Sequence, residues 1–311
     1  MKKILVYLSF LSLIVLSLIG TQIDSLFTDK YYYIVELIIL PRTLTAILAG
    51  GVLATIGYQF QILFKNNLAT PYTTGISSIA ALCLAVSELL LTHLTLSGNV
   101  SLIIYLISSV LFLSAMFIIL IKKMGRNSLL LLGVSVGIVS SSLIIFIQSF
   151  LGNESVSKLV RWMMGNIDTV GFRAPLILFI GTIILMIYAF KSRKAMTLLS
   201  ISEDFAHTRG VQVESLFRNT FFMGNTFLVI LIWFCGPIGF IGLIIPHVSQ
   251  KIFGADYSKN LMVNFFLGST LLMTATLLSK VLISTHVIPV GAITASIGAP
   301  FLVYLLLKKK I

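Results

Sequence analysis

Apolar stretches of about 20 residues recur along most of the chain, and they constrain its fold more than any other feature. Of the 311 residues, 58% are hydrophobic and only 10% are charged, whereas a soluble domain carries about 25% charged residues. A helix needs about 20 mostly apolar residues to cross the hydrocarbon core of a bilayer. The sequence therefore predicts an all-α, polytopic membrane protein without room for a large soluble domain.

Hydropathy and helix-breaking residues predict about ten transmembrane helices, which form a single transmembrane domain over residues 1–311. The first apolar stretch begins like a secretory signal peptide, but it is longer than usual and lacks an A-x-A cleavage site. We favour a retained first helix over a cleaved signal peptide. The spans are expected near residues 4–20, 41–63, 73–92, 101–121, 128–151, 174–190, 218–235, 237–253, 261–284 and 288–307.

The distribution of basic residues predicts that both termini lie in the cytoplasm. Cytoplasmic loops carry an excess of lysine and arginine, and an even number of spans puts both termini on one side. That side would hold 16 of the 22 basic residues. They are Lys2, Lys3, Lys65, Lys122, Lys123, Arg126, Lys191, Arg193, Lys194, Arg209, Arg218, Lys251, Lys259, Lys308, Lys309 and Lys310. Because this topology accounts for the net charge of +12, a nucleic-acid partner is not expected.

The longest cytoplasmic connection, at about residues 191–217, is predicted to dock a partner protein. It is polar, and it holds Glu203, Asp204 and Glu214, which the topology does not require. Ser202 is placed to cap a short helix there. The alternative is an ordinary basic loop, and the grouping of acidic residues favours a docking surface.

A run of helix-breaking residues, "GPIGFIGLIIPH" at 236–247, interrupts the apolar sequence. Two prolines bracket it and each removes a backbone donor, so we expect a short, bent helix. Irregular backbone at membrane depth is tolerated where protein or water satisfies it. The run is therefore predicted to line or gate a path across the membrane. The candidate path or gate residues are Gly236, Pro237, Gly239, Gly242 and Pro246.

The predicted spans hold few groups that could couple transport to an ion gradient or catalyse a reaction. Glu88, Lys280, His247 and His286 all lie near the ends of spans, whereas an ion-driven carrier needs an ionisable site within the membrane. Paired carboxylates, a metal-ligand cluster and an activated nucleophile are all missing from the sequence. We therefore expect neither an enzyme nor a bound cofactor. The sequence also lacks a G-x-x-x-x-G-K-[ST] motif, so ATP-driven transport would need a separate ATPase.

Several motifs resemble those of one family, the permeases of type II ABC importers that take up ferric siderophores, haem and cobalamin. The longest is "LPRTLTAILAGGVLATIGYQFQILFKNNLATPYTTGISSIAAL" at 40–82. "RWMMGNI" at 161–167, the 236–247 run and "IPVGAITASIGAPFLVYLL" at 288–306 are similar to its later motifs, in the same order. The resemblance covers almost the whole chain.

The resemblance implies ten helices per subunit in a bundle like that of the cobalamin-importer permease. It also implies two permease subunits around a central path, two cytoplasmic ATPases that bind ATP and Mg, and an extracytoplasmic binding protein. The ATPase-coupling residues would be Glu203, Ala206 and Gly210, which match E-x-x-A-x-x-x-G. Arg42 would dock the binding protein, and the broken eighth span would line and gate the path.

The implied function is import of a ferric siderophore by alternating access across the cytoplasmic membrane of a prokaryote. Haem or cobalamin is the alternative within the same class, and an ion-coupled carrier is the alternative outside it. The sequence departs from the family pattern at Ile39, Val287 and Gln250. We therefore favour, slightly, a second permease that is a related but different chain over a second copy of this one.

Overall fold

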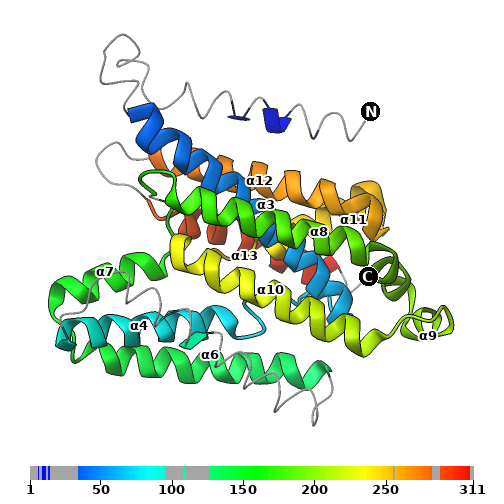
Figure 1. The fold of residues 1–311 in the computed structure, drawn as a ribbon, viewed down its shortest axis with the longest axis horizontal. Coiled ribbons are helices and arrows are strands. Elements are labelled where there is room, and N and C mark those ends of the chain that lie inside the picture. Colours follow the sequence, from blue (N-terminus) through cyan, green and yellow to red (C-terminus); the bar gives the residue numbers. More distant parts are fainter. Residues whose placement is uncertain are drawn as a thin grey trace.

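The computed structural model describes residues 34–94, 126–167, 169–254, 256–281 and 288–308, together with a few isolated residues before these ranges and at 105, 108 and 109. Every regular element in this part is helical (Figure 1). In chain order the elements are the π-helical turn η2 (Val35–Ile39), α3 (Leu40–Phe64), α4 (Ile76–Leu94), α6 (Arg126–Gln148), α7 (Asn153–Met163), α8 (Arg173–Ile201), α9 (Glu203–Thr208), α10 (Val213–Cys235), α11 (Ile241–Phe253), α12 (Tyr257–Val281) and α13 (Val290–Lys308).

Five helices of the described part are long and apolar enough to cross a membrane, and this confirms the prediction of an all-α polytopic protein. Two shorter helices, α4 and α13, are also apolar. The predicted spans at 4–20 and 101–121 lie almost entirely outside the described residues, so the total of ten stays a prediction. The five long spans are Val35–Phe64, Ser128–Gln148, Arg173–Ile201, Val213–Cys235 and Tyr257–Lys280.

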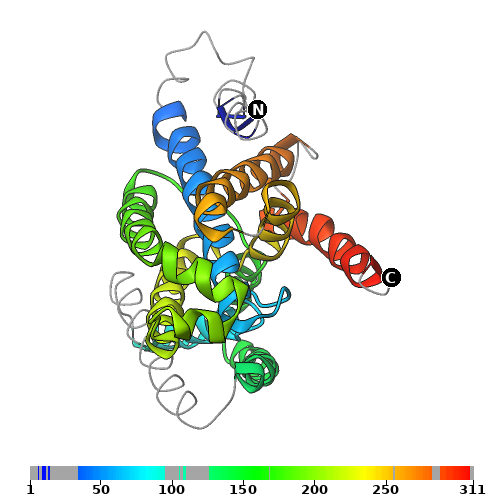
Figure 2. The same ribbon diagram turned by 90° about the vertical axis from the view of Figure 1, so that its right-hand side faces the viewer.

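Helix α3 lies at the centre of the bundle, where α8, α10, α11 and α12 pack around it (Figures 1 and 2). Small residues on α3 make these contacts close. A Cβ atom added to Gly50 would overlap the backbone of Gly268 on α12, so the two helices touch backbone to backbone. The hydroxyl of Ser269 also crosses the interface and donates to the carbonyl oxygen of Ile47 at 2.6 Å. The α3–α12 pair therefore forms a closely packed unit.

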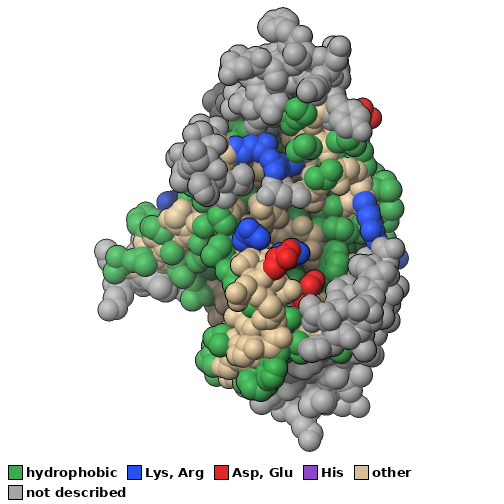
Figure 3. Space-filling model, turned by 90° about the vertical axis from the view of Figure 1, so that its left-hand side faces the viewer, with side chains coloured by type: hydrophobic (Ala, Val, Ile, Leu, Met, Phe, Trp, Pro, Cys, Tyr) green, Lys and Arg blue, Asp and Glu red, His purple; other side chains and the backbone are tan. Residues whose placement is uncertain are grey.

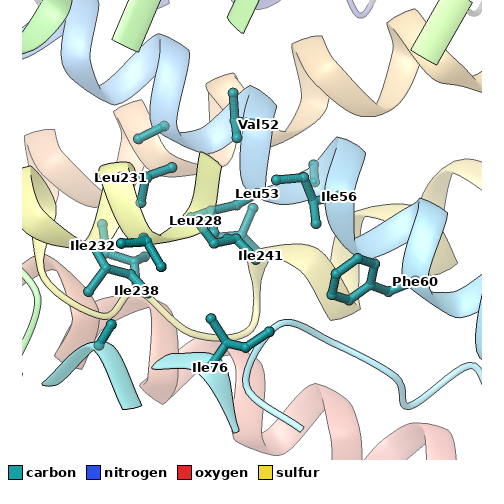
Figure 4. Packing of buried hydrophobic residues seen from close by; sticks show 14 of the residues in the cluster. Val52, Leu53, Ile56, Phe60, Ile76, Leu228, Leu231, Ile232, Ile238 and Ile241 are labelled. Carbon is teal, nitrogen blue, oxygen red and sulfur yellow. The ribbon is translucent and has the colours of Figure 1, made fainter. Parts of the chain in front are cut away.

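The hydrophobic core extends through most of the described helices, and part of it lies between α3 and α10 and reaches the start of α11 (Figure 4). Leu53 and Ile56 of α3 face Leu228 of α10, and all three side chains are at most 3% exposed. Ile238 and Ile241, from the run of helix breakers, point into the same core. Apolar packing therefore anchors the irregular segment on the bundle.

Helices α6 and α13 leave apolar side chains uncovered. On α6, Leu131, Ile138 and Ile145 are 72%, 65% and 66% exposed, and on α13 Val303 and Leu307 are 55% and 66% exposed. A transmembrane helix with such a face must meet lipid or another apolar protein surface.

Two predicted spans have the wrong bounds. The helix expected at 174–190 is α8, which extends to Ile201, because the sequence after residue 190 keeps helix-forming residues until Ser202. The span expected at 237–253 is helical only from Ile241, so α11 has 13 residues and is too short to cross a bilayer. The expected bend thus takes the form of a non-helical segment, residues 236–240, followed by a short helix.

Helix α7 was not predicted. It follows α6 directly and has one apolar side, with Leu159 buried. Its polar side carries Glu154 and Lys158, whose charged groups lie 2.6 Å apart. This pairing lowers the pKa of the exposed Glu154 carboxyl below its usual value. In Figure 1, α7 and α9 lie at opposite ends of the bundle, which we call the α7 end and the α9 end.

Candidate functional site

The predicted gate residues surround a break in the helical backbone between α10 and α11. Gly236 ends α10 with φ 64° and ψ −178°, a conformation open essentially to glycine alone. Phe240 precedes α11 and also has a positive φ, 68°, which is uncommon for a bulky residue. Its ring lies against Gly298 of α13, where an added Cβ would overlap it. The break thus combines a glycine turn with a strained aromatic residue.

Pro237 leaves a carbonyl group at the end of α10 without its usual helical donor. In a continuous helix, the N–H of residue 237 would bond to the carbonyl of Trp233, but proline has no N–H. The indole Nε1–H of Trp162, near the end of α7, donates to this carbonyl oxygen at 3.2 Å. A side chain from α7 therefore satisfies a backbone group that the break exposes.

Pro246, within α11, has the same effect on Gly242. The amide nitrogen of Gln61 on α3 lies 3.3 Å from the carbonyl oxygen of Gly242 and 3.4 Å from that of Leu243. Gly57 lies directly against Gly242, where an added Cβ would overlap the backbone. The close approach of α3 to α11 therefore places the Gln61 donor beside the Gly242 carbonyl that Pro246 leaves free and the neighbouring Leu243 carbonyl.

A third proline, Pro41, lies at the start of α3 and follows the π-helical turn η2. The carbonyl four residues earlier belongs to Leu37, and it accepts a hydrogen bond from the backbone N–H of Gly171 at 2.8 Å. The hydrogen-bond donors to the carbonyls four residues before Pro41 and Pro237 thus come from α7 or from the connection that follows it.

We call the connection between α7 and α8, residues 164–167 and 169–172, the strap. The N–H of Asn166 donates to the carbonyl of Cys235 at the end of α10 at 2.8 Å. The carbonyl of Gly165 accepts from the N–H of Gly291 at the start of α13 at 3.1 Å. The strap therefore joins η2, the end of α10 and the start of α13 at the α7 end.

The three glycines among the predicted gate residues differ in their surroundings. A Cβ on Gly236 would overlap the carbonyl oxygen of Trp162, and one on Gly242 would lie 2.9 Å from that of Leu53. A Cβ on Gly239 would meet only the ring of Tyr72, at 3.8 Å. Gly236 and Gly242 are thus required for close packing, whereas Gly239 has space for a larger side chain.

Arg42, the predicted docking residue, lies at the α7 end of α3. Its Nε donates to the carbonyl of Ile167 in the strap at 2.9 Å. It lines a small cavity with Thr43 and, from α12, Thr276 and Lys280. Figure 3 looks onto this end and shows basic side chains on the surface, with acidic side chains beside some of them.

Sequence reasoning did not associate Lys280 with Arg42. The sequence placed Lys280 near the end of its span. The two cations line one cavity because α3 packs against α12, and neither segment alone predicts that contact. The close pairing of the two helices requires glycine at positions 50 and 268, where their backbones touch. Two positive charges in one cavity favour an anionic partner group.

At the α9 end, the predicted coupling residues form a short capped helix. The hydroxyl of Ser202 accepts a hydrogen bond from the N–H of Phe205 at 2.9 Å, which confirms the predicted N-cap. Ala206 is fully buried, so it packs α9 onto the bundle, whereas Glu203 is partly exposed. Gly210 follows the helix with φ 77° and open space around it. The exposed side of this segment is free of the close packing seen at the break.

The described residues offer no group of three or more histidine, cysteine, aspartate or glutamate side chains that could hold a metal ion. Cys83 and Cys235 are both buried, and neither forms a disulfide. The arrangement is thus one of packed helices, a backbone break and charged ends.

Comparison with known proteins identifies the family. The model of the FecCD transport family matches residues 4–308. The chain belongs to this family. It is 31% identical to YvrB, an uncharacterized ABC transporter permease protein of Bacillus subtilis, over 87% of this chain and 77% of that protein. It is 30% identical to the vitamin B12 import system permease protein BtuC of Yersinia pseudotuberculosis, over 87% of this chain and 81% of that protein. The "Probable iron chelatin transport system permease protein" of Helicobacter pylori is likewise 30% identical, with the same coverage.

Solved structures show the same fold. A structure of a metal-chelate type ABC transporter in an inward-facing conformation has a TM-score of 0.84 at 24% identity, covering 99% of this chain and 100% of that one. PsaBC from Streptococcus pneumoniae, in complex with Fab, has a TM-score of 0.57 at 21% identity, covering 86% and 90%.

Membership of the FecCD family settles the class of the protein. It is the permease subunit of an ABC importer and a multi-pass protein of the bacterial inner membrane. It is not itself an enzyme, because the ATPase partner handles ATP. Such a permease works with ATPase and binding-protein partners.

Proposed function

We propose that this permease imports a ferric siderophore by alternating access, with ATP hydrolysed on partner ATPase subunits. The observation that carries the proposal is the break at 236–240, an irregular segment inside a tightly packed bundle. Irregular backbone at membrane depth is tolerated where it lines a cavity or is buried in protein, and such breaks form sites in other transporters. Gly236, Pro237, Gly239, Gly242 and Pro246 are accordingly proposed to line or gate the path.

Iron chelates are favoured over other cargoes because a relative in Helicobacter pylori is named for iron chelatin transport. Relatives in Yersinia are named for vitamin B12 import, and they support cobalamin as the second candidate. Haem is the third candidate. These are arguments from similarity, because cargo is set by path width and a few polar side chains and not by the fold.

A second permease subunit is proposed to cover the exposed apolar faces of α6 and α13. A groove of about 650 Å³ lies between α11 and α13, and it is lined by His247, Gln250, Phe301 and Tyr304 among others. Of the three positions that depart from the family, Gln250 lies in this groove and Ile39 lines the cavity of Arg42. Val287 lies outside the described residues. Departures at two surfaces favour, slightly, a related but different second permease.

The binding protein is proposed to dock at the α7 end, on Arg42 with Lys280 beside it, because two cations there suit carboxylates on a partner. The ATPases are proposed to dock at the α9 end through the segment with Glu203, Ala206 and Gly210. The described end of α13 lies at the α9 end (Figure 1), which supports a cytoplasmic C-terminus. With an even number of spans, the N-terminus would be cytoplasmic too.

Growth rescue tests the cargo. A strain from which the gene has been deleted is complemented with the wild-type gene and grown on a panel of ferric siderophores, haem and cobalamin. Rescue by a ferric siderophore alone supports the proposal, and rescue by cobalamin or haem alone replaces it with that alternative. In parallel, proteoliposomes with and without the ATPase test the energy source. Uptake by the permease alone under an imposed ion gradient would mean an ion-coupled carrier.

Expression without any second permease tests the stoichiometry. The chain is produced with its ATPase and binding protein only. A stable, transport-competent complex with two copies of this chain would refute the heterodimer, and recovery of activity only on adding a related permease would support it.

A further inference from the structure

The strap makes three separate hydrogen bonds to the continuous segment formed by η2 and α3, one to η2 and two to α3. The Ile167 carbonyl accepts from Arg42, the Thr169 hydroxyl lies 3.2 Å from that of Thr45, and the N–H of Gly171 bonds to Leu37. Ile167 itself is fully buried. This part of the strap is therefore fixed on the same turns of α3 that carry the proposed docking residue.

The preceding residues of the strap contact the break and the start of α13. Asn166 bonds to Cys235, which is the last residue of α10, and Gly165 bonds to Gly291. Gly165 also packs so closely on Pro237 that an added Cβ would lie 2.5 Å from the Pro237 carbonyl oxygen. The break therefore cannot shift toward the strap unless the strap moves with it.

The two sets of contacts meet at one pair of neighbouring residues. Asn166 holds the end of α10 through its backbone N–H, and Ile167 holds Arg42 through its carbonyl. Only one planar peptide unit separates these two residues, and Ile167 is fully buried, so a displacement of Ile167 also displaces Asn166. The distance in sequence between Arg42 and the break is thus spanned by one short, packed connection.

We infer that the strap transmits docking of the binding protein at Arg42 to the broken segment 236–240. Arg42 acts as a positioning residue that is bonded to the strap until a carboxylate of the binding protein competes for its guanidinium. A bidentate pair with a carboxylate joins opposite charges through two hydrogen bonds, whereas Arg42 makes a single hydrogen bond to the neutral carbonyl of Ile167. Docking therefore weakens the hold of Arg42 on Ile167, and the strap, the break and the start of α13 shift together. This inference rests on the proposed docking at Arg42.

A reversible disulfide between the strap and α3 tests the inference. Thr45→Cys and Thr169→Cys are introduced together with Cys83→Ala and Cys235→Ala, because the two threonine hydroxyls are close enough for their replacement thiols to bond. The complete complex with its ATPase is reconstituted in proteoliposomes. ATPase rates are measured with and without purified binding protein, so the cargo need not be known.

The oxidised variant is expected to keep its basal ATPase rate and its binding of the binding protein, but to lose the stimulation of ATPase by the binding protein. Reduction restores the stimulation. The control is Thr197→Cys with Ser258→Cys in the same background, a hydroxyl pair that is also 3.2 Å apart but joins α8 to α12. Full stimulation in the oxidised strap variant, or an equal loss in the oxidised control, overturns the inference.

A milder pair of variants covers the case in which the disulfide does not form. Thr45→Val removes the contact with Thr169, whereas Thr55→Val removes a hydroxyl of α3 that bonds only within its helix, to Gly51. We expect Thr45→Val, but not Thr55→Val, to reduce the stimulation of ATPase by the binding protein. Equal effects of the two substitutions would contradict the inference. Unchanged binding of the binding protein to Arg42→Glu would instead refute the proposal that it docks at Arg42. Failure of the docking proposal is therefore distinguishable from failure of the inference about the strap.

Discussion

The indole of Trp162 donates a hydrogen bond to the backbone carbonyl of Trp233, with 3.2 Å between nitrogen and oxygen. This bond joins α7 to the last turn of α10, four residues before Pro237. It satisfies a carbonyl that the proline leaves without a helical donor. The helix break is therefore stabilised from outside its own helix.

Loss of this donor is expected to destabilise the protein. Trp162→Phe keeps an aromatic ring but removes the N–H, so the Trp233 carbonyl loses its partner, at a cost of about 1–3 kcal/mol. Thermal unfolding in detergent measures the effect. Trp233→Phe is the matched control, because it removes a similar volume and leaves the accepting carbonyl in place. If the control is destabilised as much as Trp162→Phe, the hydrogen bond is not the cause.

Gln61 and Pro246 are expected to be coupled energetically. Gln61→Leu removes the donor to the carbonyls of Gly242 and Leu243 and should cost about 1–3 kcal/mol. In a Pro246→Ala background, residue 246 regains an N–H that can bond to Gly242 within α11, so Gln61→Leu should cost less. A double-mutant cycle on thermal stability gives the coupling energy. Additive effects would show that Gln61 does not compensate for the proline.

These relationships also show what the sequence could and could not predict. The prolines and glycines of 236–247 predicted a break, because their backbone effects are local. The donors to the carbonyls that Pro237 and Pro246 leave free could not be predicted, since Trp162 and Gln61 reach these carbonyls from other helices. Likewise, the spacing of Ser202 predicted its helix cap, but the pairing of Arg42 with Lys280 depends on tertiary contacts between α3 and α12.

Gly236 and Gly239 are expected to respond differently to substitution. Gly236→Ala should destabilise the protein by about 1–3 kcal/mol, because its backbone conformation is essentially limited to glycine and the new methyl group would overlap the Trp162 carbonyl. Gly239→Ala should be tolerated, since only the Tyr72 ring is near. Gly239→Leu should insert and fold but abolish uptake by filling the path. Full uptake with Gly239→Leu would show that the residue lies outside the gate.

The cap of α9 is expected to matter for coupling to the ATPase. Ser202→Ala removes the acceptor for the N–H of Phe205, which should weaken this short helix by about 1 kcal/mol. We expect the ATPase rate to be kept while uptake per ATP hydrolysed falls. Ser200→Ala is the control, because that hydroxyl bonds to Thr197 within α8. Equal uptake per ATP in the two variants would argue against a coupling role for α9.

The contribution of Gly210 to the same surface is tested by a pair of substitutions. With φ 77° and open space around it, position 210 should accept asparagine more readily than a bulky side chain. Gly210→Trp is expected to uncouple ATP hydrolysis from uptake, since it adds bulk on the proposed ATPase contact, whereas Gly210→Asn should stay coupled. Unimpaired coupling in Gly210→Trp would remove this glycine from the contact.

Arg42 is expected to contribute more to docking than other cations at the same end of the bundle. Arg42→Gln and Lys158→Gln change the net charge equally, but Arg42 lies in the cavity with Lys280, whereas Lys158 is exposed and pairs with Glu154 on its own helix. Loss of a charge that pairs within an interface costs about 2–5 kcal/mol and acts on dissociation, whereas loss of a rim charge mainly changes the association rate. The measurement is the binding kinetics of the purified binding protein at two salt concentrations. We expect faster dissociation from Arg42→Gln. For Lys158→Gln we expect only a small decrease in the association rate, which disappears at high salt. Indistinguishable kinetics for the two variants at low salt would mean that the cavity at the α7 end is not where the binding protein docks.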